Sequence, residues 1–179
     1  MPETGPVIYS QEQVEDSLRR IDPQALERGL DEKHQADPIA GIAIVNLEGS
    51  ILTPDGEYHL HGARVFTSST EHPNYVNPHL HKIGVEPYVV FAGDGGEMNL
   101  GWVVDGQVVW DDPKRVKPGD TIRVKEGQVH SLRNTGDAPL DFVFACPDNH
   151  LVDHSEEKPE GDRYLTKDLP NGIPPQYPK

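Results

Sequence analysis

The order of apolar and polar positions predicts a short amphipathic helix near the start of the chain. Ser10 and Gln13 have the spacing of a capping box, in which each side chain binds the backbone N–H of the other residue. Val14, Leu18 and Ile21 then follow at intervals that place them on one face of a helix.

A second short helix is predicted directly after the first. Asp22 is a favourable N-cap, Pro23 suits the first helical position, and Leu26 and Leu30 lie about one turn apart. The polar stretch DEKHQADP comes after it. We expect both helices to pack against the outside of the structure that follows.

From about Ile42 the pattern changes to short β-rich runs separated by turn residues. In chain order these runs are GIAIVNL, YHLHGARVFT, PHLHKIG, EPYVVFAG, MNLGWVV, QVVW, DTIRVK, QVHSLRN and LDFVFAC. Asp105-Gly106 is a strong two-residue hairpin signal, and residues 94–96, 118–120 and 135–137 mark further turns. Because nothing between the runs is long enough for a crossover helix, we expect antiparallel strands in an all-β sandwich or barrel.

These changes of pattern divide the chain into three parts. Residues 1–40 are the expected N-terminal helical extension, and residues 41–150 the β-barrel. Residues 151–179 are charged and proline-rich, so we expect an irregular tail that lies over the barrel or over a partner subunit.

Length and charge narrow the classes of partner. The 179 residues suit one domain, and the formal net charge of -14 disfavours nucleic acid and anionic membrane surfaces. Cys146 is the single cysteine, so no intrachain disulfide can form, which fits a reducing cytoplasm. No apolar run suits a signal peptide or a membrane span.

Four residues could bind one metal ion. His79 and His81 are two apart in an extended run, so their side chains leave the same face of the strand. After a bend at Gly84, Glu86 opens the next run and can add a carboxylate oxygen. His130, in QVHSLRN, would supply a third imidazole.

Three imidazoles and a carboxylate suit Fe(II), Mn(II), Ni(II) or Zn(II). Six-coordinate geometry would leave two adjacent positions for water, substrate or dioxygen. Whether Glu86 binds the ion directly or supports a ligand stays open. Tyr88, Gln128 and Asn134 share faces with these residues, so they could position a substrate by hydrogen bonds, and we name Tyr88 and Gln128 as candidate catalytic residues.

The other candidates have ordinary structural interpretations as well. His59 and His61 repeat the HLH pattern without a matching Glu and Gly, and indicate a plain strand from which one ring could line the pocket. Cys146 is in phase with apolar residues and should lie in the core. Trp102 and Trp110 could wall the pocket or fill the core, and an inward Arg123 or Arg133 would indicate an anionic substrate. We expect four histidines at the surface: His34, His72, His150 and His154.

The two candidate metal-binding segments resemble the paired motifs of the cupin superfamily. HLHKIGVEPYVVFAG has the spacing H-x-H-x4-E-x6-G, and GDTIRVKEGQVHSLRN matches G-x5-P-x-G-x2-H-x3-N except that Lys125 replaces the proline. The resemblance covers about residues 55 to 147. It implies a double-stranded β-helix, or jelly-roll barrel, with a metal bound by His79, His81, Glu86 and His130.

The resemblance does not fix a reaction, because similar barrels serve many chemistries. We expect a metal-dependent enzyme of dioxygenase type that acts on a small oxygen-rich organic substrate, and we favour Fe(II). The alternatives are a redox-neutral isomerase, epimerase, lyase or cyclase, or a non-catalytic binding protein. Because such barrels leave sheet edges and an apolar outer face, we also expect a homodimer.

Overall fold

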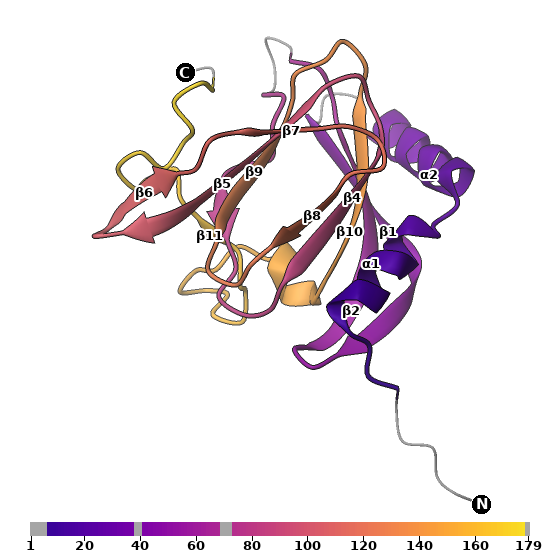
Figure 1. The fold of residues 1–179 in the computed structure, drawn as a ribbon, viewed down its shortest axis with the longest axis horizontal. Coiled ribbons are helices and arrows are strands. Elements are labelled where there is room, and N and C mark those ends of the chain that lie inside the picture. Colours follow the sequence, from indigo (N-terminus) through magenta and orange to yellow (C-terminus); the bar gives the residue numbers. More distant parts are fainter. Residues whose placement is uncertain (1–6, 38–40, 69–72, 178–179) are drawn as a thin grey trace, which may run out of the picture.

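The computed structural model describes residues 7–37, 41–68 and 73–177, in which two antiparallel sheets face each other and two helices cover one of them (Figure 1). The expected all-β fold with short N-terminal helices is confirmed. The elements are α1 (Gln11–Arg19), α2 (Pro23–Ala36), β1 (Ile42–Thr53), β2 (Gly56–Val65), β3 (His79–Leu80), β4 (Glu86–Ala92), β5 (Gly96–Val104), β6 (Gln107–Trp110), β7 (Lys114–Val116), β8 (Thr121–Val124), β9 (Val129–Asn134), β10 (Leu140–Cys146), the 3₁₀-helix η1 (Asp148–Leu151) and β11 (Tyr164–Leu165).

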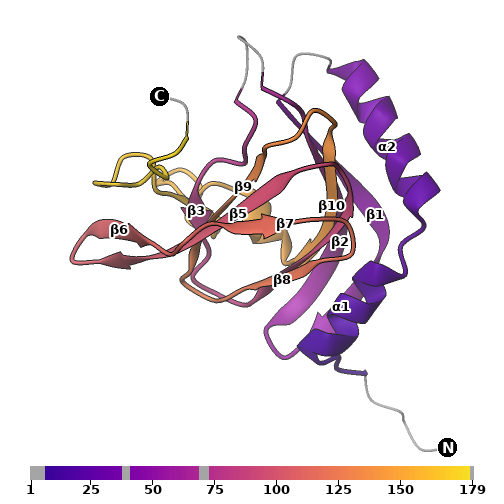
Figure 2. The ribbon, with the colours of Figure 1, turned by 45° about the horizontal axis from the view of Figure 1, so that its top comes forward.

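Both helices begin where the sequence predicts. The Ser10 hydroxyl accepts the N–H of Gln13 at 3.3 Å, and the Gln13 amide oxygen accepts the N–H of Ser10 at 2.8 Å, which completes the capping box. The Asp22 carboxylate accepts the N–H of Gln24 at 3.0 Å and starts α2. Figure 2 shows both helices along the outer side of the sheet that contains β1 and β2.

The strands form two sheets whose pairings are antiparallel. One sheet has the order β1-β2-β10-β4-β8, and the other has the order β11-β3-β9-β5-β6, with β7 also paired to β5. The predicted hairpin joins β5 to β6, and both of its turn residues have positive φ, 49° at Asp105 and 78° at Gly106. This is the conformation that a two-residue turn requires for strands of right-handed twist.

Strand β10 is buried on both faces because it separates two apolar clusters. Leu140, Phe142, Phe144 and Cys146 point into the cluster between the sheets. Val143 and Ala145 point into a second cluster, under the helices, with Leu18, Leu26 and Leu30. The expected core position of Cys146 is therefore confirmed, and its thiol is fully buried.

The C-terminal segment lies against the six-stranded sheet and includes a short strand that the sequence pattern did not indicate. In this strand, β11, Leu165 is paired with His79 of β3. Further along, the buried Tyr177 hydroxyl lies 2.9 Å from the amide nitrogen of Asn99 and 2.7 Å from the hydroxyl of Ser131. The segment is thus fixed by backbone pairing at one end and by a buried side chain at the other.

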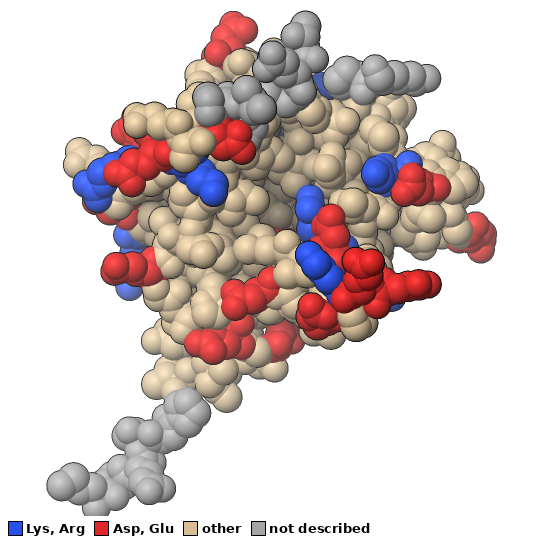
Figure 3. All heavy atoms as spheres, turned by 180° about the vertical axis from the view of Figure 1, so that it is seen from behind, with Lys and Arg blue, Asp and Glu red and all other residues tan. Residues whose placement is uncertain are grey.

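Charged groups of both signs are spread over the surface. Figure 3 shows one face on which acidic and basic side chains lie close together around a central hollow. Within the described residues, no helix combines the length and the apolar character needed to cross a membrane.

Candidate metal centre

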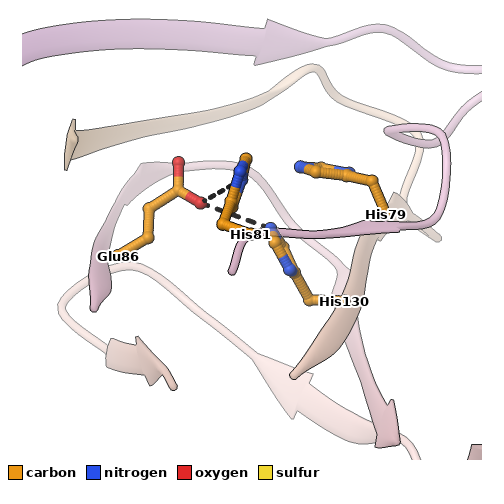
Figure 4. A group of neighbouring side chains, drawn as sticks. All are labelled: His79, His81, Glu86 and His130. Carbon is orange, nitrogen blue, oxygen red and sulfur yellow. Dashed lines mark ion pairs between the residues drawn. The ribbon is translucent and has the colours of Figure 1, made fainter. Parts of the chain in front are cut away.

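The four residues singled out by the sequence come together between the sheets. His79 begins β3, His81 follows it, Glu86 begins β4, and His130 lies on β9 directly opposite His79 in the strand register. All four side chains are at least 96% buried, and their ligand atoms lie within 4.8 Å of one another. Figure 4 shows the Glu86 carboxylate facing the rings of His81 and His130, with His79 beside them.

In each of the three histidines of the cluster, one ring nitrogen is hydrogen-bonded to a backbone carbonyl. The Nδ1 atoms of His79, His81 and His130 lie 2.7, 2.8 and 3.3 Å from the carbonyl oxygens of Asn77, Asp162 and Gln128. A carbonyl oxygen can only accept, so each Nδ1 carries the hydrogen and each Nε2 keeps its lone pair. This fixes the tautomer that a metal ligand needs.

The distances between the ligand atoms suit a metal ion of ordinary size. Oε2 of Glu86 lies 3.0 Å from Nε2 of His81 and 3.3 Å from Nε2 of His130. Ligands about 2.1 Å from one ion are about 3.0 Å apart at an octahedral edge and about 3.4 Å apart in a tetrahedron. Moreover, Nε2 of His81 and Oε2 of Glu86 are buried without a hydrogen-bond partner among the described residues. The donor set therefore fits a divalent metal ion.

The electrostatics of the cluster keep most of these groups in the forms that bind a cation. Burial lowers the pKa of His79 well below its usual range, and it lowers the pKa of His130 against the effect of Glu86. Burial also opposes the charge on Glu86, but the facing imidazoles of His81 and His130 hold its pKa well below the usual range. Burial opposes the charge on His81 too, yet the Glu86 carboxylate raises the pKa of that ring.

The three residues that were expected to position a substrate have different places. The Tyr88 hydroxyl lies 3.2 Å from Nε2 of His130, and burial raises the pKa of Tyr88 well above its usual range, so it remains a hydrogen-bond donor. Gln128 instead accepts the N–H of Lys125 at 3.1 Å and stabilises the turn before β9. Asn134 binds backbone atoms of Val65, Ala138 and Gly136.

The expectation that His150 lies at the surface is wrong. Helix η1 turns its side chain inward, where it is 1% exposed, and its Nε2 lies 2.7 Å from the carbonyl oxygen of Ile83. Its ring stacks on His81 with centroids 3.9 Å apart, and its Nδ1 has no partner among the described residues. Sequence reasoning had no signal for this position, because His150 follows the last barrel strand in a stretch without periodicity.

The other histidines do not belong to the four-residue cluster. In the repeated HLH pattern, His59 is partly exposed, whereas His61 is buried. Nδ1 of His61 lies 3.1 Å from the side-chain oxygen of Asn46, and its ring stacks on Phe144. His34 is half-buried against Phe66, so its expected surface position is only partly met. His154 is exposed as expected, and His72 lies outside the described residues.

The tryptophans and arginines considered from the sequence all lie away from the cluster. Trp102 is 40% exposed, and Trp110 donates to the carbonyl of Asn171 near the surface. Arg123 pairs with Glu15 of α1, and Arg133 donates to the carbonyl of Gln176. The arginine that does reach the site is Arg163, which the sequence reasoning missed.

A cavity of about 330 Å³ opens beside the four residues. Its polar wall comprises Asn77, His79, Glu86, Tyr88, His150 and Arg163, and its apolar wall comprises Ile42, Ile44, Ala63, Val76, Phe142, Phe144 and Leu151. Its volume is in the range of pockets for small organic ligands. The candidate ligands His79 and Glu86 therefore border a space that could hold a small molecule.

Comparison with known proteins identifies a domain within the chain. The family model described as "Cupin domain" matches residues 76–146, which contain all four candidate ligands, whereas no curated protein matches the chain in sequence. Among solved structures, a mutant of the salicylate 1,2-dioxygenase from Pseudoaminobacter salicylatoxidans has a TM-score of 0.51 at 14% identity, over 70% of this chain and 33% of that one.

Two further structures are similar over shorter parts. An oxalate oxidase in complex with glycolate has a TM-score of 0.46 at 17% identity, over 59% of this chain and 50% of that one. A DMSP lyase from Ruegeria pomeroyi has a TM-score of 0.42 at 22% identity, over 62% of this chain and 48% of that one. The chain thus spans half or less of the length of these three proteins. The chain thus contains a cupin domain at residues 76–146, and its two antiparallel sheets have the fold of the cupins it resembles.

Proposed function

We propose that this cupin is a metal-dependent enzyme of dioxygenase type that acts on a small, oxygen-rich organic molecule. The observation that carries the proposal is the set of three buried imidazoles whose Nδ1 atoms face backbone carbonyls, leaving each Nε2 for a metal ion. Glu86 adds an oxygen, and the cavity gives room for a substrate beside it. His79, His81, Glu86 and His130 are the proposed metal ligands.

Fe(II) is the metal we propose, with Mn(II), Ni(II) and Zn(II) as the alternatives that the same donor set accepts. A bound iron ion would supply Lewis acidity and the electron transfer that a reaction between an organic substrate and dioxygen requires. A redox-silent ion would instead suit an isomerase, epimerase, lyase or cyclase. A protein that binds the ion and a ligand without turnover is the third possibility.

The chain's own residues would bind and orient the substrate. The Tyr88 hydroxyl, which stays protonated at neutral pH, is placed to donate a hydrogen bond to a substrate oxygen at the metal-facing end of the cavity. The apolar wall around Phe142 and Phe144 would keep water away from that end. Gln128, the other residue proposed as catalytic, would act indirectly, because its side chain holds the turn that leads into the His130 strand.

Metal content and oxygen consumption test the proposal. The purified protein, reconstituted with Fe(II), Mn(II), Ni(II) or Zn(II), should bind about one ion per chain, and the iron form should consume oxygen with a catechol, a hydroxyketone or a hydroxy acid. His130→Ala should lose both the metal and the activity. His59→Ala is the matched control, because His59 is partly exposed and lies outside the cluster.

Three results would contradict parts of the proposal. If the protein binds none of these ions, the proposal of a metal-dependent enzyme is wrong. If metal-free His130→Ala stays active, the ion is not needed for catalysis. A metal-loaded protein that converts substrate without using oxygen would replace the dioxygenase by one of the redox-neutral reactions.

We also propose a homodimer in the cytoplasm. The hairpin of β5 and β6 exposes Trp102, Val103, Val104 and Val109, each 40 to 50% accessible, and such apolar groups are suited to contact a second copy. The lone, buried Cys146 is compatible with a reducing compartment. Light scattering should give twice the 19.9 kDa chain mass, and a monomer at micromolar concentration would contradict the dimer.

A further inference from the structure

The cavity beside the proposed metal ligands contains one permanent positive charge. Arg163 lines it together with His79, Glu86 and Tyr88, and it is the only Lys or Arg among the described lining residues. Its side chain is 24% exposed, so the guanidinium lies at the opening rather than in bulk solvent. A guanidinium at this place can select substrates by charge.

Backbone contacts fix the position of Arg163 relative to the histidines. Its N–H donates to the carbonyl of Val152 at 3.1 Å, and its own carbonyl accepts the N–H of His154 at 2.9 Å. The backbone carbonyl oxygen of the preceding residue, Asp162, accepts a hydrogen bond from Nδ1 of His81. The strand that follows, β11, pairs with the strand of His79. Arg163 is therefore anchored in the same framework as two of the proposed ligands.

The guanidinium has hydrogen-bonding capacity left for a ligand. Its Nη1 atom donates to Asp153 at 3.0 Å, and that carboxylate is 51% exposed. The Nε and Nη2 groups have no hydrogen-bond partner within the described part of the chain. Glu86, the other charged lining residue, faces His81 and His130 instead.

Part of the cavity lining is apolar. Ile42, Ile44, Phe142 and Phe144 belong to this apolar wall. Burying apolar surface of a ligand there is favourable, because that surface is removed from water. A ligand that fills the cavity would therefore have an anionic end at Arg163 and an apolar body against this wall.

We propose that the substrate of this site is a small organic carboxylate with an apolar body, and that Arg163 binds its carboxylate. This inference rests on the proposed function, because it takes the cavity as the substrate site. A carboxylate is favoured over a phosphate, because one guanidinium matches a single negative charge, whereas a phosphate dianion in a largely apolar cavity would require more cations. Arg163 would thus determine specificity for the acid over its neutral analogues.

Binding of 4-fluorobenzoate and its neutral analogue 4-fluorobenzamide, followed by fluorine NMR, tests the inference. The metal-free protein should bind the acid about tenfold more tightly than the amide, because a hydrogen bond to a charged group contributes about 1.5 kcal/mol or more. In Arg163→Gln the preference should disappear while amide binding stays the same. Arg115→Gln is the control, because Arg115 is exposed on β7 and does not line the cavity.

A second measurement follows the binding of the acid in the wild-type protein itself. With ¹⁵N-labelled arginine in the wild-type protein, the Nε–H resonance of Arg163 should shift on addition of 4-fluorobenzoate and stay in place with the amide. Arg163→Lys assigns that resonance, since the signal disappears in this variant. An unchanged resonance in the presence of bound acid would overturn the inference.

The two proposals fail in different ways. The role of Arg163 would be overturned if the preference for the acid persists in Arg163→Gln, or if the wild type shows no preference. Either result would count even if the protein binds iron and consumes oxygen. A protein that binds no metal ion but keeps an Arg163-dependent preference for the acid would overturn the proposed enzyme and leave the carboxylate site standing. Repeating the titration with zinc-loaded protein distinguishes two modes of carboxylate binding. Binding at Arg163 is lost in Arg163→Gln, whereas binding at the zinc ion is not.

Discussion

At the scale of single residues, buried polar side chains in this protein depend on backbone atoms for their orientation. The three histidines among the proposed metal ligands each face a backbone carbonyl oxygen through Nδ1. Tyr58 shows the same principle outside the metal centre: its hydroxyl is fully buried and accepts the N–H of Val85 at 3.0 Å, close to the bend at Gly84. Burial of such groups disfavours their charged forms, and this makes stability depend on pH.

We predict that Tyr58 makes the protein less stable at high pH. Burial, with a smaller effect of Asp55, raises the pKa of Tyr58 to about 12, whereas an unfolded tyrosine ionises near 10. Between these values the unfolded chain releases the proton first, so stability present below pH 10 is lost as the pH rises towards 12. The loss should reach about 2 kcal/mol after allowance for solvent screening.

Urea unfolding between pH 8 and 11.5 checks this prediction. Tyr58→Phe should be less stable than the wild type at pH 8, because the N–H of Val85 loses its acceptor, but the difference should shrink as the pH rises. Tyr88 and Tyr177, whose pKa values burial also raises, ionise in both proteins, so their effects cancel in the comparison. Parallel stability curves for the two proteins would contradict the role of Tyr58.

At the scale of elements, a buried ion pair connects α2 to the sheet beneath it. Nε and Nη2 of Arg64 on β2 each lie 2.7 Å from a carboxylate oxygen of Asp141 on β10. Its Nη1 also reaches Asp31 on α2. Strand β10 can carry a charge at this otherwise apolar position because the guanidinium binds both oxygens of the carboxylate.

We predict that Asp141→Ala lowers the free energy of unfolding by about 3 kcal/mol, since it leaves the Arg64 charge buried and only partly compensated. Asp16→Ala is the matched control, because Asp16 pairs with Arg19 at an exposed position, where the change should stay below about 1 kcal/mol. Guanidinium chloride unfolding followed by circular dichroism measures both. Equal, small losses would mean that the Arg64 pair contributes no more than a surface contact.

At the scale of the whole molecule, the C-terminal segment contributes to the candidate metal centre. Asp162 binds residues that lie much earlier in the chain. Its backbone carbonyl oxygen faces Nδ1 of His81 at 2.8 Å, and its carboxylate accepts the N–H groups of Lys82 and Ile83, each at 3.0 Å. The loop between β3 and β4 is thereby held from outside the barrel strands. His150 arrives from the same part of the chain and stacks on His81.

Asp162→Ala removes the carboxylate that binds the N–H groups of Lys82 and Ile83 but keeps the backbone carbonyl that faces His81. We predict that it weakens metal binding by about 10- to 100-fold without unfolding the protein, because the loop directly after His81 loses its anchor. Zinc affinity measured by competition with a chelator gives the change, and circular dichroism verifies the fold. Asp168→Ala serves as the control, because Asp168 is an exposed acid of the same segment. An affinity unchanged in Asp162→Ala would show that the carboxylate contacts with Lys82 and Ile83 do not help to position His81.

Local sequence patterns determined the elements and the proposed ligands. The capping box at Ser10, the hairpin at Asp105-Gly106 and the strand period all depend on neighbouring residues, so their physical causes are visible in short stretches of sequence. The spacing of His79 and His81 places both on one side of an extended segment for the same reason. The two cupin motifs then added Glu86 and His130 from further along the chain.

Only the tertiary structure decided which other groups join these ligands. His150, Asp162 and Arg163 come from a segment without periodicity, and their contacts with the His79–Glu86 region span more than 60 residues of sequence. Gln128 and Asn134, which share a strand face with His130, bind backbone atoms of turns instead of the cavity. Such contacts follow from how a loop folds back over a closed barrel, and local periodicity does not encode that path.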